Sequence, residues 1–178
     1  MESLIDRMVR ASKLDINLYE EVEADKSSMG QAITVVVLSS VASGIGAIGI
    51  MGIQGLIVGT ISALIGWFVW AYLTYLIGTK LLPEPQTKAD VGELLRTIGF
   101  SSAPGVLRIF GFIPLIGVFI SFVAGIWMLV AMIIAVRQAL DYKSTWRAIG
   151  VCVIGFIIYI IVIAVIMSVL GLPSAVMG

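Results

Sequence analysis

The chain has no histidine, one cysteine and few charged residues. Histidine is the commonest general base and transition-metal ligand, so its absence removes the usual donors for a metal ion, a haem group or proton transfer. The single Cys152 cannot form a disulfide within the chain, and no base lies near it in the sequence to activate its thiol. We therefore expect no catalytic residue, no metal and no cofactor.

Charged residues make up only 12% of the sequence, whereas 60% are hydrophobic and the mean hydropathy is +1.10. A soluble globular domain carries about twice that share of charge. The net charge is zero and basic residues alternate with acidic ones, which gives no support to nucleic-acid binding. This composition indicates an integral membrane protein.

Long apolar stretches predict an all-α membrane domain, because a helix needs about 20 apolar residues to cross a bilayer. The five expected spans are residues 29–51, 54–82, 94–113, 115–140 and 146–172. Residues 1–28 precede this membrane domain (29–172) as an amphipathic and acidic segment, and residues 173–178 follow it as a short uncharged tail.

The distribution of charge predicts the orientation of these spans. Basic loop residues are retained on the cytoplasmic side during insertion. With the N-terminus inside and the C-terminus outside, every basic residue except Arg108 lies on the cytoplasmic side, and so do all 11 carboxylates. We expect a multi-pass protein of the cytoplasmic (inner) membrane.

A helix over residues 1–13 is amphipathic at 100° per residue. Its apolar face carries Met1, Leu4, Ile5, Met8 and Val9, and its polar face carries Glu2, Asp6, Arg7, Arg10 and Lys13. Such a helix either lies in the headgroup plane as an interfacial helix or packs on the cytoplasmic face of the protein itself. A second short helix is expected at residues 18–24.

The third span contains Ser101, Ser102, Pro104 and Arg108, and it allows two interpretations. A re-entrant loop would place the next basic loop outside, against the positive-inside rule, so we favour a full crossing that is kinked at Pro104. Local hydroxyl groups commonly satisfy the carbonyls that a proline frees. The serines lack a Gly-x-Ser-x-Gly motif and a nearby base, so a hydrolase is not expected.

The second span carries a row of small residues, Gly55, Gly59 and Ala63, at intervals of four. Small residues at this spacing let helix backbones approach closely in a bilayer. We expect this row to form a packing seam with a neighbouring helix, and we expect a short turn at residues 52–55 to join the first two spans.

Arg108 is the only ionisable residue well inside a predicted span. Such a charge costs roughly 2.5–3.5 kcal/mol on insertion scales and marks a candidate functional residue. We expect it to reach the outer headgroups or to pair helices; the alternative is a substrate or lipid site. At the cytoplasmic side, Arg96, Arg137 and Arg147 lie near several carboxylates, either as a docking site for a partner or as a solvated face.

Three groups of residues occur in an order that resembles a known family. They are Ser102-Ala103-Pro104-Gly105, then Ile113-Pro114-Leu115-Ile116-Gly117, and then Arg137-Gln138-Ala139-Leu140 followed by Ser144-Thr145-Trp146-Arg147-Ala148. Over roughly residues 20–170 the sequence resembles the Yip-one (Ypt/Rab-interacting protein) domain family of five-span membrane proteins, in its prokaryotic form.

The resemblance implies architecture more than activity. Eukaryotic relatives have long cytoplasmic N-terminal regions and act in vesicle trafficking with small GTPases. This sequence has only residues 1–28 there and no Tyr-Gly-Pro-type motif, so we do not expect it to bind a small GTPase.

Together these patterns predict a non-enzymatic interaction protein: a scaffold, assembly factor or accessory subunit. Its expected partners are the lipid bilayer and other integral membrane proteins or a second copy of itself. The alternative is a small transporter or channel with Arg108 near its binding site, because helices broken by Pro and Gly mark transport sites in larger proteins.

Overall fold

The computed structural model describes residues 2–169, which contain helices and no strand. The elements are α1 (Leu4–Ser12), α2 (Ile16–Ala24), η1 (Lys26–Ser28), α3 (Met29–Gly46), α4 (Ile48–Leu76), the π-helical turn η2 (Ile77–Leu81), α5 (Val91–Ser101), the 3₁₀ helix η3 (Ala103–Phe112), α6 (Ile116–Ala139) and α7 (Thr145–Val169). The predicted all-α class is confirmed. The predicted tail 173–178 and the last residues of the fifth span lie outside the described residues.

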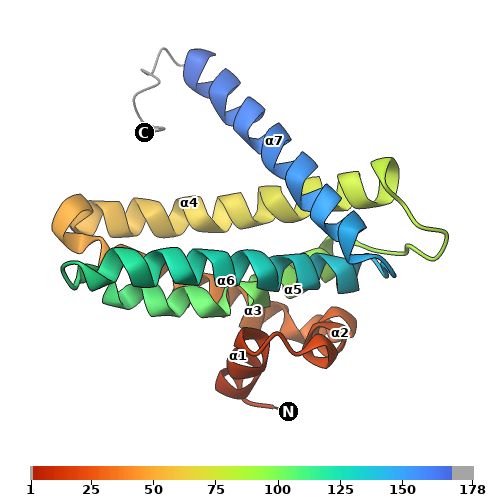
Figure 1. Cartoon of the computed structure of the whole chain (residues 1–178), viewed down its shortest axis with the longest axis horizontal. Coiled ribbons are helices and arrows are strands. Elements are labelled where there is room, and N and C mark those ends of the chain that lie inside the picture. Colours follow the sequence, from red (N-terminus) through yellow and green to blue (C-terminus); the bar gives the residue numbers. More distant parts are fainter. Residues whose placement is uncertain (1, 170–178) are drawn as a thin grey trace.

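Four segments of the described chain are long and apolar enough to cross a membrane: Lys26–Gly46, Gly52–Leu81, Ile116–Ala139 and Thr145–Val162. The protein is therefore a multi-pass membrane protein. Helices α4 and α6 follow the long axis of the molecule, whereas α7 leaves α4 at a steep angle (Figure 1). We call the end formed by α2 and residues 82–90 and 141–144 the charged end. The opposite end, formed by the turns at residues 47–52 and 113–115, is the apolar end.

The first span ends earlier than predicted. Helix α3 stops at Gly46 rather than near Met51, and the chain turns at Ala47 and again at Gly52. Gly52 has φ +65°, in the left-handed region that favours glycine. A Cβ atom at Gly46 would lie 2.1 Å from the carbonyl oxygen of Arg108, so the helix ends where its backbone meets η3.

The third predicted span consists of two pieces. Helix α5 begins with a capping box in which Asp90 and Glu93 each accept a bond from the other's backbone N–H. It ends at Ser101, and Pro104 lies in the first turn of η3, as the predicted kink requires. The Ser101 hydroxyl donates to the Ile98 carbonyl over 2.7 Å and so stabilises the last turn of α5. At 1.5 Å and 2.0 Å per residue, the two helices extend over roughly 36 Å.

Helices α1 and α2 pack on the membrane helices, in agreement with the second interpretation of the N-terminal segment. Leu18, Tyr19 and Val22 of α2 are fully buried against residues of α3, α5 and α6. Trp127 of α6 donates its indole N–H to the Ser12 carbonyl over 2.7 Å. The apolar face of α1 is only partly covered, because the Ile5 side chain is 72% exposed.

The buried core lies in the half of the bundle toward the charged end. It contains a cluster of fully buried apolar residues from α4, η2, α5, α6 and α7, among them Ala71, Ile77, Leu94, Leu140 and Val151. The Tyr142 hydroxyl closes this end by donating to the carbonyls of Gly78 and Leu82. The cavities described below extend from the apolar end to Trp67, Trp70 and Ile98, which border this core.

Candidate functional site

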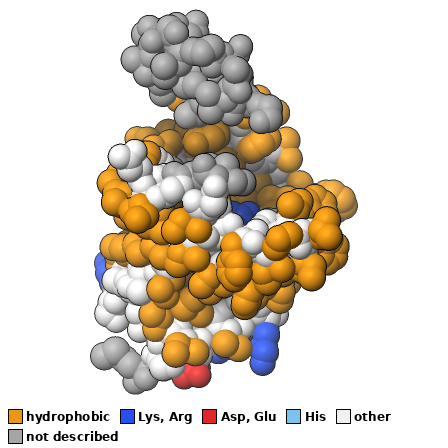
Figure 2. Space-filling view, turned by 90° about the vertical axis from the view of Figure 1, so that its left-hand side faces the viewer, with side chains coloured by type: hydrophobic (Ala, Val, Ile, Leu, Met, Phe, Trp, Pro, Cys, Tyr) orange, Lys and Arg blue, Asp and Glu red, His pale blue; other side chains and the backbone are white. Residues whose placement is uncertain are grey.

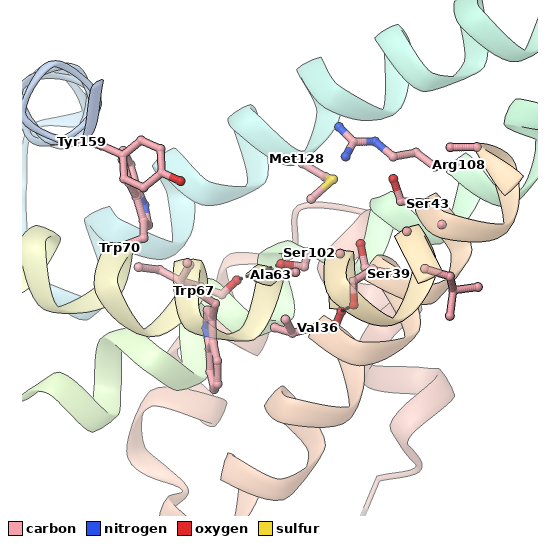
Figure 3. Close-up of a pocket in the computed structure, with 18 residues that line it drawn as sticks. Val36, Ser39, Ser43, Ala63, Trp67, Trp70, Ser102, Arg108, Met128 and Tyr159 are labelled. Carbon is pink, nitrogen blue, oxygen red and sulfur yellow. Dashed lines mark hydrogen bonds between the residues drawn. The ribbon is translucent and has the colours of Figure 1, made fainter. Parts of the chain in front are cut away.

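A cavity of about 460 Å³ lies between α3, α4 and α6. Its labelled lining residues in Figure 3 are Val36, Ser39, Ser43, Ala63, Trp67, Trp70, Ser102, Arg108, Met128 and Tyr159. Serine hydroxyls and one guanidinium thus line a space inside an otherwise apolar bundle. We call it the central cavity, and Arg108 is the only charged residue that lines it.

A second cavity of about 350 Å³ lies nearer the apolar end and shares Ser43, Ala47 and Arg108 with the first. We call it the outer chamber. Its lining residues are Ser43, Gly46, Ala47, Arg108, Gly111, Gly117, Val118 and Ser121. They belong to α3, η3, α6 and the turns beside them. Ala47 lies just before α4, and no residue of α4 itself lines this chamber.

Arg108 projects from η3 between these two cavities (Figure 3). Its Nη2 atom lies 3.3 Å from the position that a Cβ atom would take at Gly125, so the missing side chain there leaves room for the guanidinium against α6. The Nε atom is buried and has no hydrogen-bond partner among the described residues. A buried donor without an acceptor costs about 1–3 kcal/mol.

The row of small residues lies beside open space in the described chain. A Cβ atom at Gly59 would have no neighbouring atom within 4 Å, and Gly55 and Ala63 line the central cavity beside it. The close approach of α3 and α4 occurs instead at Gly44, where a Cβ atom would lie 3.0 Å from Cγ of Leu56. Within the described chain, no neighbouring helix packs closely on the row at Gly59, so a seam with another helix stays a prediction.

Arg96, Arg137 and Arg147 do not form one charged network. Arg147 pairs with Glu84 over 3.3 Å and also donates to the Pro83 carbonyl, so it holds the loop after η2. Arg137 donates to the carbonyls of its own loop, at Tyr142 and Lys143. Each arginine thus fixes a different piece of backbone.

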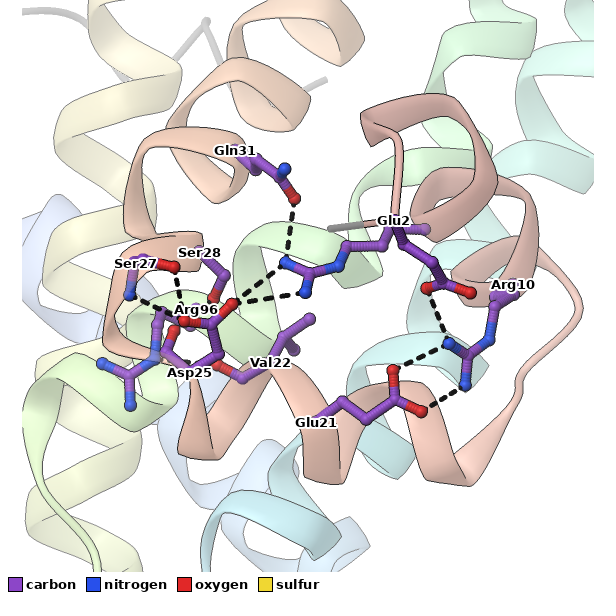
Figure 4. Close-up of polar contacts among 10 residues, drawn as sticks. Glu2, Arg10, Glu21, Val22, Asp25, Ser27, Ser28, Gln31 and Arg96 are labelled. Atoms are coloured by element: carbon purple, nitrogen blue, oxygen red, sulfur yellow. Dashed lines mark hydrogen bonds and ion pairs between the residues drawn. The ribbon is translucent and has the colours of Figure 1, made fainter.

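Arg96 is buried, with 4% of its surface exposed, and it binds the C-terminal end of α2 (Figure 4). Its Nε donates to the Val22 carbonyl over 2.8 Å and its Nη2 donates to the Glu23 carbonyl. A cation there satisfies carbonyls that lack helical partners and interacts favourably with the helix dipole. Arg96 therefore fastens α2 to α5.

Two further arginines, Arg7 and Arg10, form ion pairs that sequence reasoning did not predict. Arg7 pairs with Asp25 over 3.2 Å and donates to Gln31 over 3.0 Å (Figure 4). Arg10 binds Glu2, Asp15 and Glu21, which raises its pKa and lowers the pKa values of Asp15 and Glu21. Because Arg7 and Asp25 are 18 residues apart, no helical spacing indicates their pairing.

Glu23 is the most perturbed carboxyl group at the charged end. Burial raises its pKa to about 8, and the nearby carboxylates of Asp141, Glu20 and Glu93 act in the same direction. The guanidinium of Arg96 opposes this shift. These surroundings favour the protonated form of Glu23.

The Yip1 domain family model matches residues 18–166, from α2 to α7. The chain belongs to the Yip1 domain family. Comparison with curated proteins and with solved structures finds no match.

The part of the chain that matches the Yip1 domain includes both cavities, Arg108 and Pro104, whereas α1 precedes it. The resemblance seen in the sequence is thus confirmed at the level of the family. Arg108 and the two cavities thus lie within the part of the chain that matches the Yip1 domain, and they combine a guanidinium and hydroxyl groups with apolar walls.

Proposed function

We propose that this Yip1-domain protein is a non-enzymatic membrane interaction protein that acts as a scaffold, assembly factor or accessory subunit. Its partner is another integral membrane protein or a second copy of the chain, which places a transmembrane helix along Gly55, Gly59 and Ala63. The observation that carries this proposal is the open space at Gly59, on a helix face that is otherwise suited to close packing.

The position of α7 supports this proposal. The helix contacts α4 near Trp70, whose ring stands edge-on to that of Tyr159 with the centroids 6.3 Å apart. Beyond this contact α7 leans away from α4 (Figure 1). Tyr159 is the α7 residue that lines the central cavity. Small residues on an uncovered helix face let a second backbone approach closely, which is a main source of helix association in lipid.

The same proposal includes the finer topology. We propose that α5 and η3 together make a fifth crossing, with the N-terminus in the cytoplasm and the C-terminus outside the cytoplasmic membrane. Helix α1 then lies at the inner headgroup boundary. Its exposed Ile5 and Val9 lie beside Leu38 and Leu107 along one apolar groove, which supports an interfacial position.

Photo-crosslinking in native membranes tests partner binding. A photoreactive residue at Ala63, which lines the cavity, should give a discrete protein adduct, whereas one at the outward-facing Ile61 should react with lipid. Gly59→Leu puts a large side chain into the open space beside Gly55 and Ala63, which should keep the partner helix away and abolish the adduct. Co-expression of two differently tagged copies identifies a second copy as the partner.

Gly49→Leu is the control, because Gly49, in the short helical turn before Gly52, also has open space around it but does not line the central cavity. It should leave the adduct unchanged. An adduct that persists in Gly59→Leu, or that appears equally from positions 61 and 63, would contradict the proposal.

A small transporter or channel is the second candidate, favoured by the position of Arg108 between two adjoining cavities. Anion flux into proteoliposomes that requires Arg108, in a protein that gives no Ala63 adduct, would support this candidate over the scaffold.

A further inference from the structure

The outer chamber brings a positive charge together with two hydroxyl groups inside an apolar bundle. Arg108 supplies a guanidinium, and Ser43 and Ser121 line the chamber from α3 and α6. No Asp or Glu lines it, and Arg108 has no ion pair or hydrogen bond among residues 2–169. The site therefore has donors for an anion and no anion from the described chain.

The glycine residues around the chamber hold its walls close together without filling it. A Cβ atom at Gly117 would lie 2.2 Å from the Gly111 carbonyl oxygen, and the Gly46 and Gly111 backbones are in direct contact. These contacts fix η3 between α3 and α6, which holds Arg108 in place. A donor set that is positioned in advance loses less entropy when a ligand binds.

The surroundings of the chamber favour a lipid over a free ion. Val118 lines the chamber and is 79% exposed, and Phe119 and Leu115 are also exposed at this end. Figure 2 shows this end of the molecule covered by hydrophobic side chains, with a basic group visible in a hollow between them. Such a rim suits acyl chains, while the hollow suits a charged head.

We propose that the outer chamber binds the phosphate group of an anionic membrane phospholipid through Arg108, with Ser43 and Ser121 as hydroxyl donors and the acyl chains along the apolar rim. A guanidinium binds phosphate oxygens through two parallel N–H bonds, which an ammonium group cannot reproduce. The ligand supplies the acceptor that Arg108 lacks. This inference goes beyond the proposed function: Gly55, Gly59 and Ala63 line the central cavity and not the outer chamber, although Ser43 and Arg108 line both.

Native mass spectrometry of the delipidated full chain in detergent tests the proposal, with phosphatidylglycerol as the probe. The wild type should retain one phosphatidylglycerol in preference to phosphatidylcholine. Arg108→Gln and Arg108→Lys should each weaken that binding about tenfold or more. Arg147→Gln, which removes an arginine at the charged end, should leave it unchanged.

Ser121→Phe provides a second route, because it fills the chamber while Arg108 stays in place. It should abolish retention of the lipid in a protein whose helical circular dichroism is unchanged, even if Arg108→Gln fails to fold. Equal binding of phosphatidylglycerol by the wild type and a folded Arg108→Gln or Ser121→Phe protein would overturn the proposal. A rise in thermal midpoint with inorganic phosphate equal to that with the lipid would overturn the assignment to a lipid.

The Ala63 adduct separates this inference from the proposed function. Loss of the lipid in Arg108→Gln with an unchanged adduct supports the chamber independently of the partner site. Loss of the adduct in Gly59→Leu with unchanged lipid binding supports the partner site independently of the chamber.

Discussion

At the scale of single residues, arginines fasten the charged end by donating to backbone carbonyl groups. Arg96 binds the end of α2, Arg137 binds its own loop, and Arg147 binds the backbone that follows η2. These bonds fix main-chain groups that would otherwise lack partners near the membrane surface. The three arginines therefore stabilise the fold, whereas the Arg108 side chain has no such partner among the described residues.

The raised pKa of Glu23 predicts a pH-dependent stability. Its pKa is about 8 in the folded protein, against an ordinary value of 4.5. The folded state therefore holds this proton more tightly, so the stabilisation is complete below pH 4.5 and is lost as the pH rises through 8. We expect the thermal midpoint in detergent to fall as the pH rises from about 4.5 to about 8, and Glu23→Gln to remove this contribution to the decline.

Glu21→Gln is the control for this measurement. Glu21 lies in the same helix, but its pKa is lowered by its pair with Arg10, so its loss should leave the decline between about pH 4.5 and 8 in place. A Glu23→Gln protein with the same decline as the wild type would show that another group titrates.

The sequence singles out Arg108 as a charge within a predicted span, but it does not predict the surroundings of this side chain. The cost of a charge in lipid follows from residue type and position in a span. The room for its guanidinium comes from Gly125, in another helix, and the two cavities that it lines arise from the packing of α3, α4, η3 and α6. Contacts between distant segments leave no periodic signal in a single sequence.

At the scale of elements, the ends of helices depend on contacts between backbones. Helix α3 stops at Gly46, where the backbone of η3 blocks any side chain, and Gly52 reverses the direction of the chain with its positive φ. Hydropathy alone continues the first span to residue 51, because Ile48, Ile50 and Met51 are apolar. The predicted boundary was wrong there since hydropathy does not register steric contact.

Gly46→Ala should destabilise the protein by roughly 1–3 kcal/mol, the usual cost of inserting a group into a filled site. The added Cβ atom would lie 2.1 Å from the Arg108 carbonyl oxygen, and backbone cannot move aside as a flexible side chain does. A lower midpoint of unfolding in detergent measures the effect.

Gly49→Ala tests the same change nearby, where no atom lies within 4 Å of the new Cβ atom. Alanine is favoured over glycine inside a helix by about 0.5–1 kcal/mol, so this variant should be neutral or slightly more stable. Equal destabilisation by the two variants would show that the contact at Gly46 has no special role.

At the scale of the whole molecule, four spans follow from length and apolar composition, and the third predicted span does not. Neither α5 nor η3 is long enough alone, and only their succession gives a segment that reaches from the charged end toward the apolar end. Hydropathy therefore does not determine the number of crossings, and an experiment that maps the topology is needed.

Fusions to alkaline phosphatase after Thr87, Tyr142 and Gly178 test the orientation. The enzyme is active only outside the cytoplasm, so activity is expected at Gly178 alone, since basic residues gather near the other two sites. Activity at Tyr142 would restore the re-entrant interpretation of residues 94–113, and a cytoplasmic reporter with the opposite pattern serves as the control.

The burial of α2 has a consequence for the order of events during synthesis. Leu18, Tyr19 and Val22 emerge from the ribosome early, yet they pack against Phe100 of α5 and Ala135 of α6, which are made much later. The first helices translated are thus among the last to dock, and their apolar residues remain uncovered until α6 has inserted. A chain that stalls before α6 would display this surface, which offers chaperones and proteases a way to distinguish incomplete insertion from a finished protein.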